Sequence, residues 1–303
     1  MSLLYLILLK NARGINMKRT KVAFVYDFDK TLSTTYMQDY FLIPELGMKP
    51  EDFWREANTW SAENGVDQVT GSMYYFKMMA EKKGLRLTRK NLQSCGAFVV
   101  FFNGVEDWFT RINKYGRYLD LDIEHYIISS GYEEIIEGCA IRPFFKEVYG
   151  CAFAYGEDGI PVWPARAVNY SGKVQYLSKI NKGLGKYDDK AVNEYIPDDK
   201  RRIPYSRIIY FGDGATDIPS MKMVKNHGGT TIAVYKPRSG AKNKAVKLLQ
   251  DNRVNFALAA DYREGKEIDC VIKTILNKIA TERDLEILKQ REDKKKKNAS
   301  CPI

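Results

Sequence analysis

The sequence contains only two histidines and five cysteines among its 303 residues. The cysteines have neither the paired spacing of a zinc site nor the density of a disulfide framework. This excludes a soft-metal site built from clustered histidine and cysteine. It also favours a reducing, cytoplasmic environment. The five positions are Cys95, Cys139, Cys151, Cys270 and Cys301.

Long hydrophobic runs are also missing. The apolar start, residues 3–9, is too short to span a bilayer, and no small-residue cleavage site precedes Lys10. The sequence therefore predicts neither a membrane protein nor an exported one. Because Met17-Lys18-Arg19 leads directly into a β-rich segment, we interpret residues 1–17 as an N-terminal extension without a catalytic role.

The chain is basic, with a formal net charge of +10, but its lysines are scattered. Their only run, residues 294–297, lies in a charged tail over residues 281–303. The part of this tail after a helical segment ending near Gln290 is predicted to be solvated and disordered. Nucleic acid binding is therefore disfavoured. Hydrophobic residues make up 45% and charged residues 28%, which suits one globular core domain with an insertion.

Acidic and hydroxyl clusters follow three β-rich segments, residues 21–26, 125–128 and 207–211. Because ligands bind where the strands of open α/β sheets end, we expect the clusters to converge on one crevice. The clusters are Asp27-Phe28-Asp29-Lys30-Thr31, Ser129-Ser130-Gly131 and Gly212-Asp213-Gly214-Ala215-Thr216-Asp217.

Bringing these carboxylates together favours a bound cation. At distances of a few ångströms, each pair would repel by about 1–4 kcal/mol at water-like to surface-like dielectric. Mg²⁺ fits best, because it combines one or two carboxylates with waters and substrate phosphate oxygens. The predicted metal ligands are Asp27, Asp29, Asp213 and Asp217.

Two assignments leave alternatives open. Ser130 could bind a ligand or act as the N-cap of a helix over residues 133–137. Lys173 follows Ser171-Gly172 and precedes an amphipathic pattern, which predicts a loop entering a helix. Lys179 and Lys182 are the competing lysines.

In this order, the motifs resemble those of the haloacid dehalogenase superfamily, and within it phosphatases similar to phosphoserine phosphatase. The resemblance covers most of residues 20–235. It implies that Asp27 is a nucleophile forming an aspartyl phosphate and that Asp29 is the general acid and base. It also implies phosphate binding by Thr31, Ser129 or Ser130, and Lys173, with Asp213 as a direct metal ligand and Asp217 behind it.

Asp29 also separates the reaction types of this superfamily. P-type ATPases and dehalogenases lack a carboxylate two residues after the nucleophile, whereas this chain carries one. A phosphatase or phosphotransferase is left, and hydrolysis is favoured because no segment suggests a nucleotide cofactor.

The resemblance implies an α/β fold, a Rossmann-like doubly wound parallel sheet with an inserted helical cap domain. The predicted core comprises residues 18–35 and 103–280, and helical patterning over residues 36–102 predicts the cap. Further expected elements are a hairpin over residues 144–164, a surface excursion over 183–203, a strand over 232–235 and helices over 104–118 and 242–251.

The substrate is predicted to differ from phosphoserine. Phosphoserine phosphatases carry a glutamate nine residues after the nucleophile, where this chain has Tyr36. An aromatic side chain suits a larger or less charged group, including a quaternary amine bound by cation–π contact. The sequence thus predicts a Mg²⁺-dependent phosphatase acting on a small phosphorylated metabolite. The alternatives are a phosphatase acting on protein or nucleic acid, and a non-catalytic phosphate-binding regulatory protein.

Overall fold

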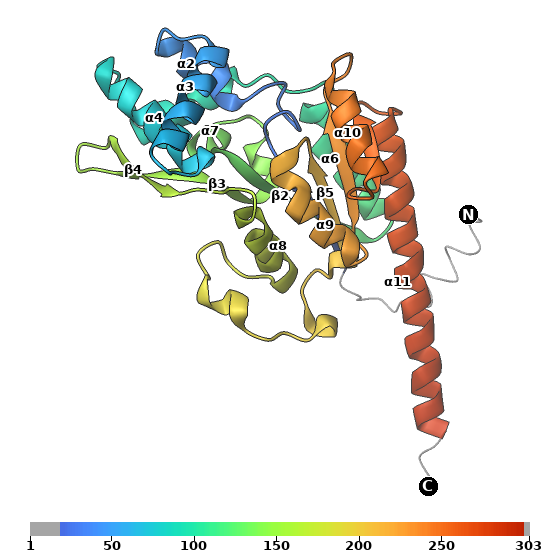
Figure 1. Ribbon diagram of the computed structural model, residues 1–303. Coiled ribbons are helices and arrows are strands. Elements are labelled where there is room, and N and C mark those ends of the chain that lie inside the picture. The colour runs from blue at the N-terminus through green and yellow to red at the C-terminus, as the bar shows by residue number, and fades with distance from the viewer. Residues whose placement is uncertain (1–18, 300–303) are drawn as a thin grey trace.

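The computed structural model describes residues 19–299, which surround a seven-stranded sheet (Figure 1). The strand order is β4-β3-β2-β1-β5-β6-β7, and every neighbouring pair is parallel except β3 and β4. The strands are β1 (Thr20–Tyr26), β2 (Leu121–Tyr132), β3 (Phe145–Tyr155), β4 (Pro161–Arg166), β5 (Ile208–Gly212), β6 (Thr230–Tyr235) and β7 (Phe256–Ala259).

The topology places the motifs at one edge of this sheet. The chain builds β2 and β3 on one side of β1, then returns to build β5, β6 and β7 on the other side. Tyr26, the last residue of β1, pairs with Ile127 on β2 and Phe211 on β5. The residues that follow therefore meet where the strand order reverses, which is where ligands bind in such folds.

Helices cover both faces of the sheet, as the predicted doubly wound fold requires. α6 (Val105–Tyr118) contacts α11 (Glu267–Ala299), whereas α8 (Gly172–Lys182) contacts α9 (Ile218–Asn226). α6 buries Trp108, Phe109 and Ile112 on one face, as their spacing predicted. The remaining α-helix of the core's second half is α10 (Ala241–Gln250), which packs on β6 and β7.

The segment between β1 and β2 is helical, as predicted. It contains α2 (Leu42–Glu45), α3 (Pro50–Glu63), α4 (Gln68–Lys82) and α5 (Arg89–Ser94), with short 3₁₀ turns at Met37–Asp39 and Cys95–Phe98. α3 and α4 pack through Phe53, whose ring lies 6.2 Å from that of Phe76. We call residues 36–102 the helical insertion.

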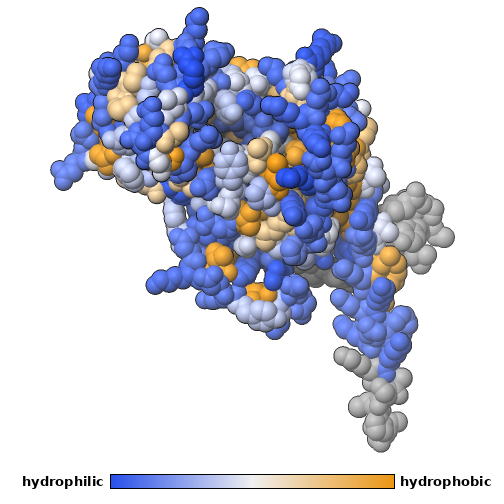
Figure 2. Space-filling model, in the orientation of Figure 1, coloured by the Kyte–Doolittle hydropathy of each residue, from blue (hydrophilic) through white to orange (hydrophobic). Residues whose placement is uncertain are grey.

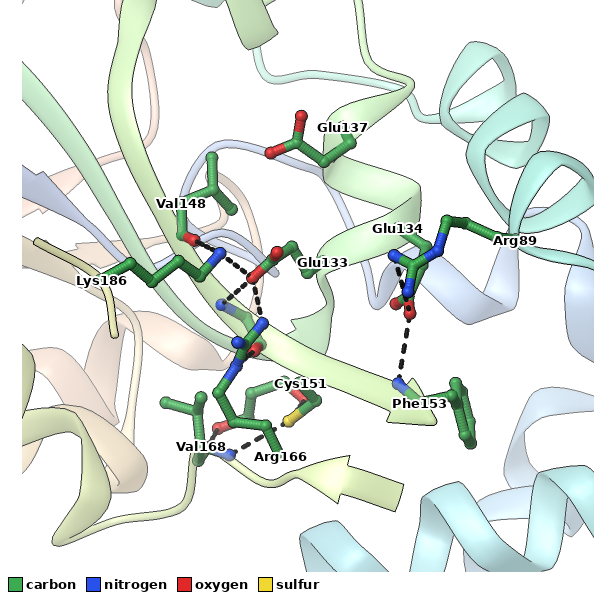
Figure 3. A network of polar contacts seen from close by, with 12 residues as sticks. Arg89, Glu133, Glu134, Glu137, Val148, Cys151, Phe153, Arg166, Val168 and Lys186 are labelled. Carbon is green, nitrogen blue, oxygen red and sulfur yellow. Dashed lines mark hydrogen bonds and ion pairs between the residues drawn. The ribbon is translucent and has the colours of Figure 1, made fainter. Parts of the chain in front are cut away.

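The β3–β4 hairpin is tied to the core by a polar network on α7 (Glu133–Glu137) (Figure 3). Glu133 accepts hydrogen bonds from Gly150 of β3 and Arg166 of β4, and it pairs with Lys186. Glu134 accepts from the Phe153 amide at 3.2 Å. The hairpin and the chain that follows it are thereby fixed relative to β2.

The expectation of disorder after Gln290 is wrong for residues 291–299, because α11 continues through them to Ala299. Its carboxyl-terminal turns project beyond the sheet (Figure 1). On the face drawn in Figure 2, hydrophilic residues predominate and apolar groups are separated. Among residues 19–299, no helix is long and apolar enough to cross a membrane.

Candidate active site

Lys173 lies between two carboxylates at the edge of the sheet. Its Nζ donates to Asp27 Oδ1 at 2.8 Å and to Asp217 Oδ1 at 2.7 Å. Asp217 also accepts from the Tyr210 hydroxyl at 2.7 Å. Burial alone would lower the pKa of Lys173, but Asp217 and Asp27 outweigh it and raise that pKa well above its usual value. The lysine therefore stays charged without contact with solvent.

The loop between β4 and α8 brings Lys173 to this position. The Ser130 hydroxyl donates to the Val168 carbonyl at 2.7 Å, and the Val168 amide lies 3.2 Å from the Cys151 sulfur (Figure 3). The Asn169 side chain then accepts from the Gly172 amide at 3.0 Å. These contacts place the first turn of α8 beside β1. The competing Lys179 instead donates to the Lys186 carbonyl, outside this cluster.

Asp27, Asp213 and Asp217 form an acidic cluster. One oxygen of each lies within 4.8 Å of the others, and Asp27 and Asp217 are buried. Burial raises the pKa of Asp213 to about 6, and the Asp217 charge adds to that rise. Three hard oxygen donors in a poorly hydrated site suit Mg²⁺, which would relieve their mutual repulsion. These are therefore the residues that could hold the predicted metal.

Asp29 lies outside this cluster and has different partners. Its Oδ1 accepts from the Met37 amide at 2.8 Å and from the Ser33 hydroxyl at 3.5 Å. Burial raises the pKa of Asp29 to about 7, although the Met37 hydrogen bond opposes the rise. A carboxyl group of that pKa can both donate and accept a proton near neutrality. The metal role predicted for Asp29 remains a prediction.

The predicted phosphate-binding residues lie in three settings. Ser129 is buried beside the acidic cluster, and its hydroxyl accepts from the Gly131 amide at 3.0 Å. Ser130 is not a helix cap, because α7 has Tyr132 as its N-cap and no side-chain cap bond. Instead, Ser130 holds Val168. Thr31 is fully buried, and its hydroxyl has no hydrogen-bond partner in the part of the chain that the structure describes.

Two adjoining cavities open from these residues. The first, of about 410 Å³, is lined by Asp27, Ser129 and Asp213, and we call it the phosphate cavity. The second, of about 280 Å³, is lined mainly by the helical insertion, and we call it the leaving-group cavity. The residues that line both are Asp29, Tyr36, Ser130, Tyr170 and Thr216.

Several lining residues are not predicted by the motifs. Lys30 lines the phosphate cavity, and its Nζ lies 3.4 Å from the centre of the Tyr36 ring. Tyr170 comes from the loop before Lys173 and lines both cavities. Trp54 on α3 lines the leaving-group cavity. The only sequence signal for Trp54 was its place among the aromatics of the insertion, which fits packing equally well.

The arrangement brings buried carboxylates and a buried lysine together around one crevice, and a family comparison shows which family the chain belongs to. The model of the haloacid dehalogenase-like hydrolase family matches residues 24–222, which include every motif above. The chain belongs to this family. The family resemblance of the sequence is thereby confirmed, and the protein is a haloacid dehalogenase-like hydrolase.

Similar proteins agree with this assignment. An uncharacterized protein of Borreliella burgdorferi is 28% identical over 84% of this chain and 96% of its own length. A probable phosphoserine phosphatase from Vibrio cholerae superposes with a TM-score of 0.55 at 11% identity, over 92% of this chain and 74% of that one. A substrate-bound phosphoserine phosphatase gives 0.52 at 16% identity, over 81% and 97%. At such identities, the two structures show a shared fold.

Proposed function

We propose that this hydrolase is a Mg²⁺-dependent phosphatase that cleaves a small phosphomonoester through an aspartyl-phosphate intermediate. The observation that carries the proposal is the position of Asp27. Its Oδ1 is held by Lys173, which leaves Oδ2 to attack, and Asp29 lines the same cavity. The phosphoserine phosphatase neighbours support the same reaction class.

In the first step, Asp27 attacks phosphorus as the bond to the leaving alcohol breaks. Asp29, the only other carboxyl group at the end of β1, gives its proton to that alcohol. In the second step, Asp29 takes a proton from water, which attacks the same phosphorus and releases phosphate and the Asp27 carboxylate. Lys173 stabilises the negative charge that develops on the phosphoryl oxygens.

The chemistry of the donor set supports a magnesium site at Asp27, Asp213 and Asp217. When bound, the cation neutralises phosphoryl charge and offsets carboxylate repulsion. The helical insertion would act as a cap that excludes water and selects the leaving group. Its small cavity supports a small substrate over a macromolecule, and the cysteine usage supports a cytoplasmic location.

The test is phosphate release from p-nitrophenyl phosphate with Mg²⁺. Replacement Asp27→Asn is expected to lower kcat at least 1,000-fold, because an amide does not form the intermediate. Asp29→Asn is expected to release nitrophenolate in a burst, since nitrophenolate leaves without a proton, and then to turn over slowly, because the second step lacks its base. Equal turnover in wild type and Asp27→Asn would contradict the mechanism. Wild-type inactivity with retained Mg²⁺ binding would favour a regulatory phosphate-binding protein.

A further inference from the structure

The leaving-group cavity has little charge. Among its lining residues in the described part of the chain there is no lysine, arginine or histidine, and the only charged residue is Asp29. The nearby cations, Lys30 and Lys244, line the phosphate cavity instead. A carboxylate on the leaving group would lose hydration here without gaining a cation, which is costly. The cavity therefore disfavours phosphoserine.

A cationic leaving group is disfavoured as well. The ring of Tyr36 already receives the ammonium group of Lys30, at 3.4 Å from its centre. Its other large neighbour is Trp54, whose ring lies 4.9 Å away with a tilt of 50°. A quaternary amine over Tyr36 would meet Lys30 or displace it. The cation–π contact predicted from the sequence is thus occupied within the protein itself.

The cavity is instead equipped for neutral hydrogen-bonding groups. Gln38 lines it and is only 4% exposed, although its Oε1 is itself buried away from the cavity. Asn58 and Gln68 add two more amides, and Trp54 adds an aromatic surface on which an apolar ring face can pack.

We propose that the leaving group is a neutral polyhydroxyl alcohol, so that the substrate is a sugar or polyol monophosphate, with its hydroxyls hydrogen-bonded to the side-chain amides of Asn58 and Gln68. This inference rests on the proposed phosphatase function. It concerns only the group that departs from phosphorus, and its volume must suit a cavity of about 280 Å³. That volume is adequate for a single sugar or polyol.

The first experiment compares kcat/KM of the wild-type enzyme with Mg²⁺ on glucose 6-phosphate, sorbitol 6-phosphate, phosphoserine and phosphocholine. At least one neutral polyol phosphate is expected to exceed both charged substrates tenfold or more. If phosphoserine or phosphocholine is the best substrate, the inference is wrong. Turnover of p-nitrophenyl phosphate in the same series reports on the phosphatase chemistry separately.

Two variants test the residues behind the preference. Asn58→Leu, on α3, keeps the side-chain size but removes the amide, so the ratio of polyol phosphate to p-nitrophenyl phosphate kcat/KM is expected to fall at least tenfold. Gln250→Met, at the exposed end of α10, is the control and should keep the ratio. Thermal unfolding of both variants shows whether a loss is due to misfolding.

The second variant supplies the missing cation. Gln68→Arg, at the first residue of α4, is expected to raise kcat/KM for phosphoserine at least tenfold relative to the polyol phosphates, whereas Gln68→Met should not. An unchanged ratio in both Asn58→Leu and Gln68→Arg would overturn the assignment of this cavity.

Binding separates failure of this inference from failure of the proposed function. Asp27→Asn, titrated calorimetrically with the same four compounds and Mg²⁺, is expected to bind a polyol phosphate most tightly even though it does not turn it over. Preference for phosphoserine in that titration overturns the inference while the phosphatase proposal stands. Wild-type inactivity on every compound together with no preference in the titration overturns both.

Discussion

At the residue scale, the buried lysine of the site is stabilised by carboxylates held directly beside it. Lys173 is completely buried and bonded to both Asp27 and Asp217. Removing one partner of a buried ion pair typically costs about 3–5 kcal/mol, because the other is left uncompensated. A Lys173 variant would therefore confuse folding with catalysis. Asp27→Asn is the better probe, because its amide oxygen can still accept from Lys173.

His125 on β2 is a buried titratable residue behind the site. Trp108 Nε1 donates to the Tyr26 hydroxyl at 2.9 Å, so that hydroxyl donates to His125 Nδ1 at 3.2 Å. The ring proton then lies on Nε2 and is donated to Asn113 Oδ1 at 2.9 Å. This chain of donors requires a neutral imidazole, and burial lowers the pKa of His125 from 6.5 to about 3.

This residue is predicted to make folding stability depend on pH. The folded state binds fewer protons than the unfolded state between the folded pKa of about 3 and 6.5. The stabilisation is therefore fully present above pH 6.5 and is lost as pH falls, by up to about 1.4 kcal/mol per pH unit. The raised pKa values of Asp29 and Asp213 give slopes of the opposite sign in this range. The contribution of His125 is therefore the difference in slope between wild type and His125→Gln, measured by urea unfolding at pH 7, 6 and 5.

The second histidine provides the control for that measurement. His227 is exposed at the end of α9, so His227→Gln is expected to keep the wild-type slope between pH 7 and 5. Equal slopes in wild type and His125→Gln would show that His125 does not carry the effect.

The sequence predicted the residues whose place depends on strand ends and missed those whose place depends on loop geometry. Asp27 and Asp213 follow β1 and β5, so their convergence follows from the sheet topology. Lys30 contacts the Tyr36 ring because its own backbone has a φ of 58°. This left-handed conformation is rare for lysine, and the local sequence does not predict it. The Ser130 hydroxyl donates to the Val168 carbonyl because the loop after β4 passes beside it, and the sequence around Ser130 does not predict this contact.

At the element scale, the helical insertion rests on the core through a close backbone contact. A Cβ atom at Gly138, after α7, would lie 1.7 Å from the Gln93 carbonyl oxygen on α5. Beside it, Arg89 of α5 stacks its guanidinium 4.4 Å from the Tyr155 ring and pairs with Glu134 at 3.9 Å (Figure 3). The tight contact fixes how α5 sits over the site.

Gly138→Ala is predicted to destabilise the protein by about 1–3 kcal/mol, the usual cost of inserting a methyl group into a packed region. Because the obstacle is backbone, α5 must shift, and kcat/KM is expected to fall as well. Urea unfolding and phosphatase kinetics measure the two effects. Gly240→Ala is the control, since a Cβ there meets nothing within 4 Å. Equal stability of the two variants would contradict the role of this contact.

Elements with strong local patterns were predicted, and others were not. α4 begins at Gln68, earlier than its apolar pattern, because Asp67 caps the amides of Val69 and Thr70. β7 was missed because it has four residues and is defined by pairing with β6. The charged segment after residue 280 is helical because lysine and glutamate are good helix formers and pair along it, as Lys278 and Glu282 do at 3.5 Å.

At the scale of the whole molecule, the acidic cluster and the leaving-group cavity are built by different parts of the chain. The sheet places the acidic cluster, whereas the insertion supplies Trp54, Asn58 and Gln68 to the leaving-group cavity. The order of the motifs was sufficient to predict the acidic cluster, because that order determines which strand ends meet. The leaving-group cavity depends on how helices distant from the motifs pack against the edge of the sheet, and the sequence therefore did not identify the substrate.

The acidic cluster is expected to lower the stability of the fold when no cation is bound. Without a cation, Asp27, Asp213 and Asp217 repel one another, and only Asp27 and Asp217 are bonded to Lys173 among the described residues. Saturating Mg²⁺ is therefore expected to stabilise the fold, by about 2.7 kcal/mol at 100 times its Kd. Asp213→Asn removes one charge, so this variant should unfold at a higher temperature than wild type in EDTA. It should also lose most of the Mg²⁺-dependent rise in melting temperature and its phosphatase activity.

Thermal unfolding with EDTA and with Mg²⁺ measures the two effects on stability. Asp199→Asn, which is exposed within residues 183–203, is the control and should behave as wild type under both conditions. A lower melting temperature for Asp213→Asn than for wild type in EDTA would mean that hydrogen bonding of this carboxylate outweighs its repulsion by Asp27 and Asp217. The cluster would then stabilise the fold without a metal.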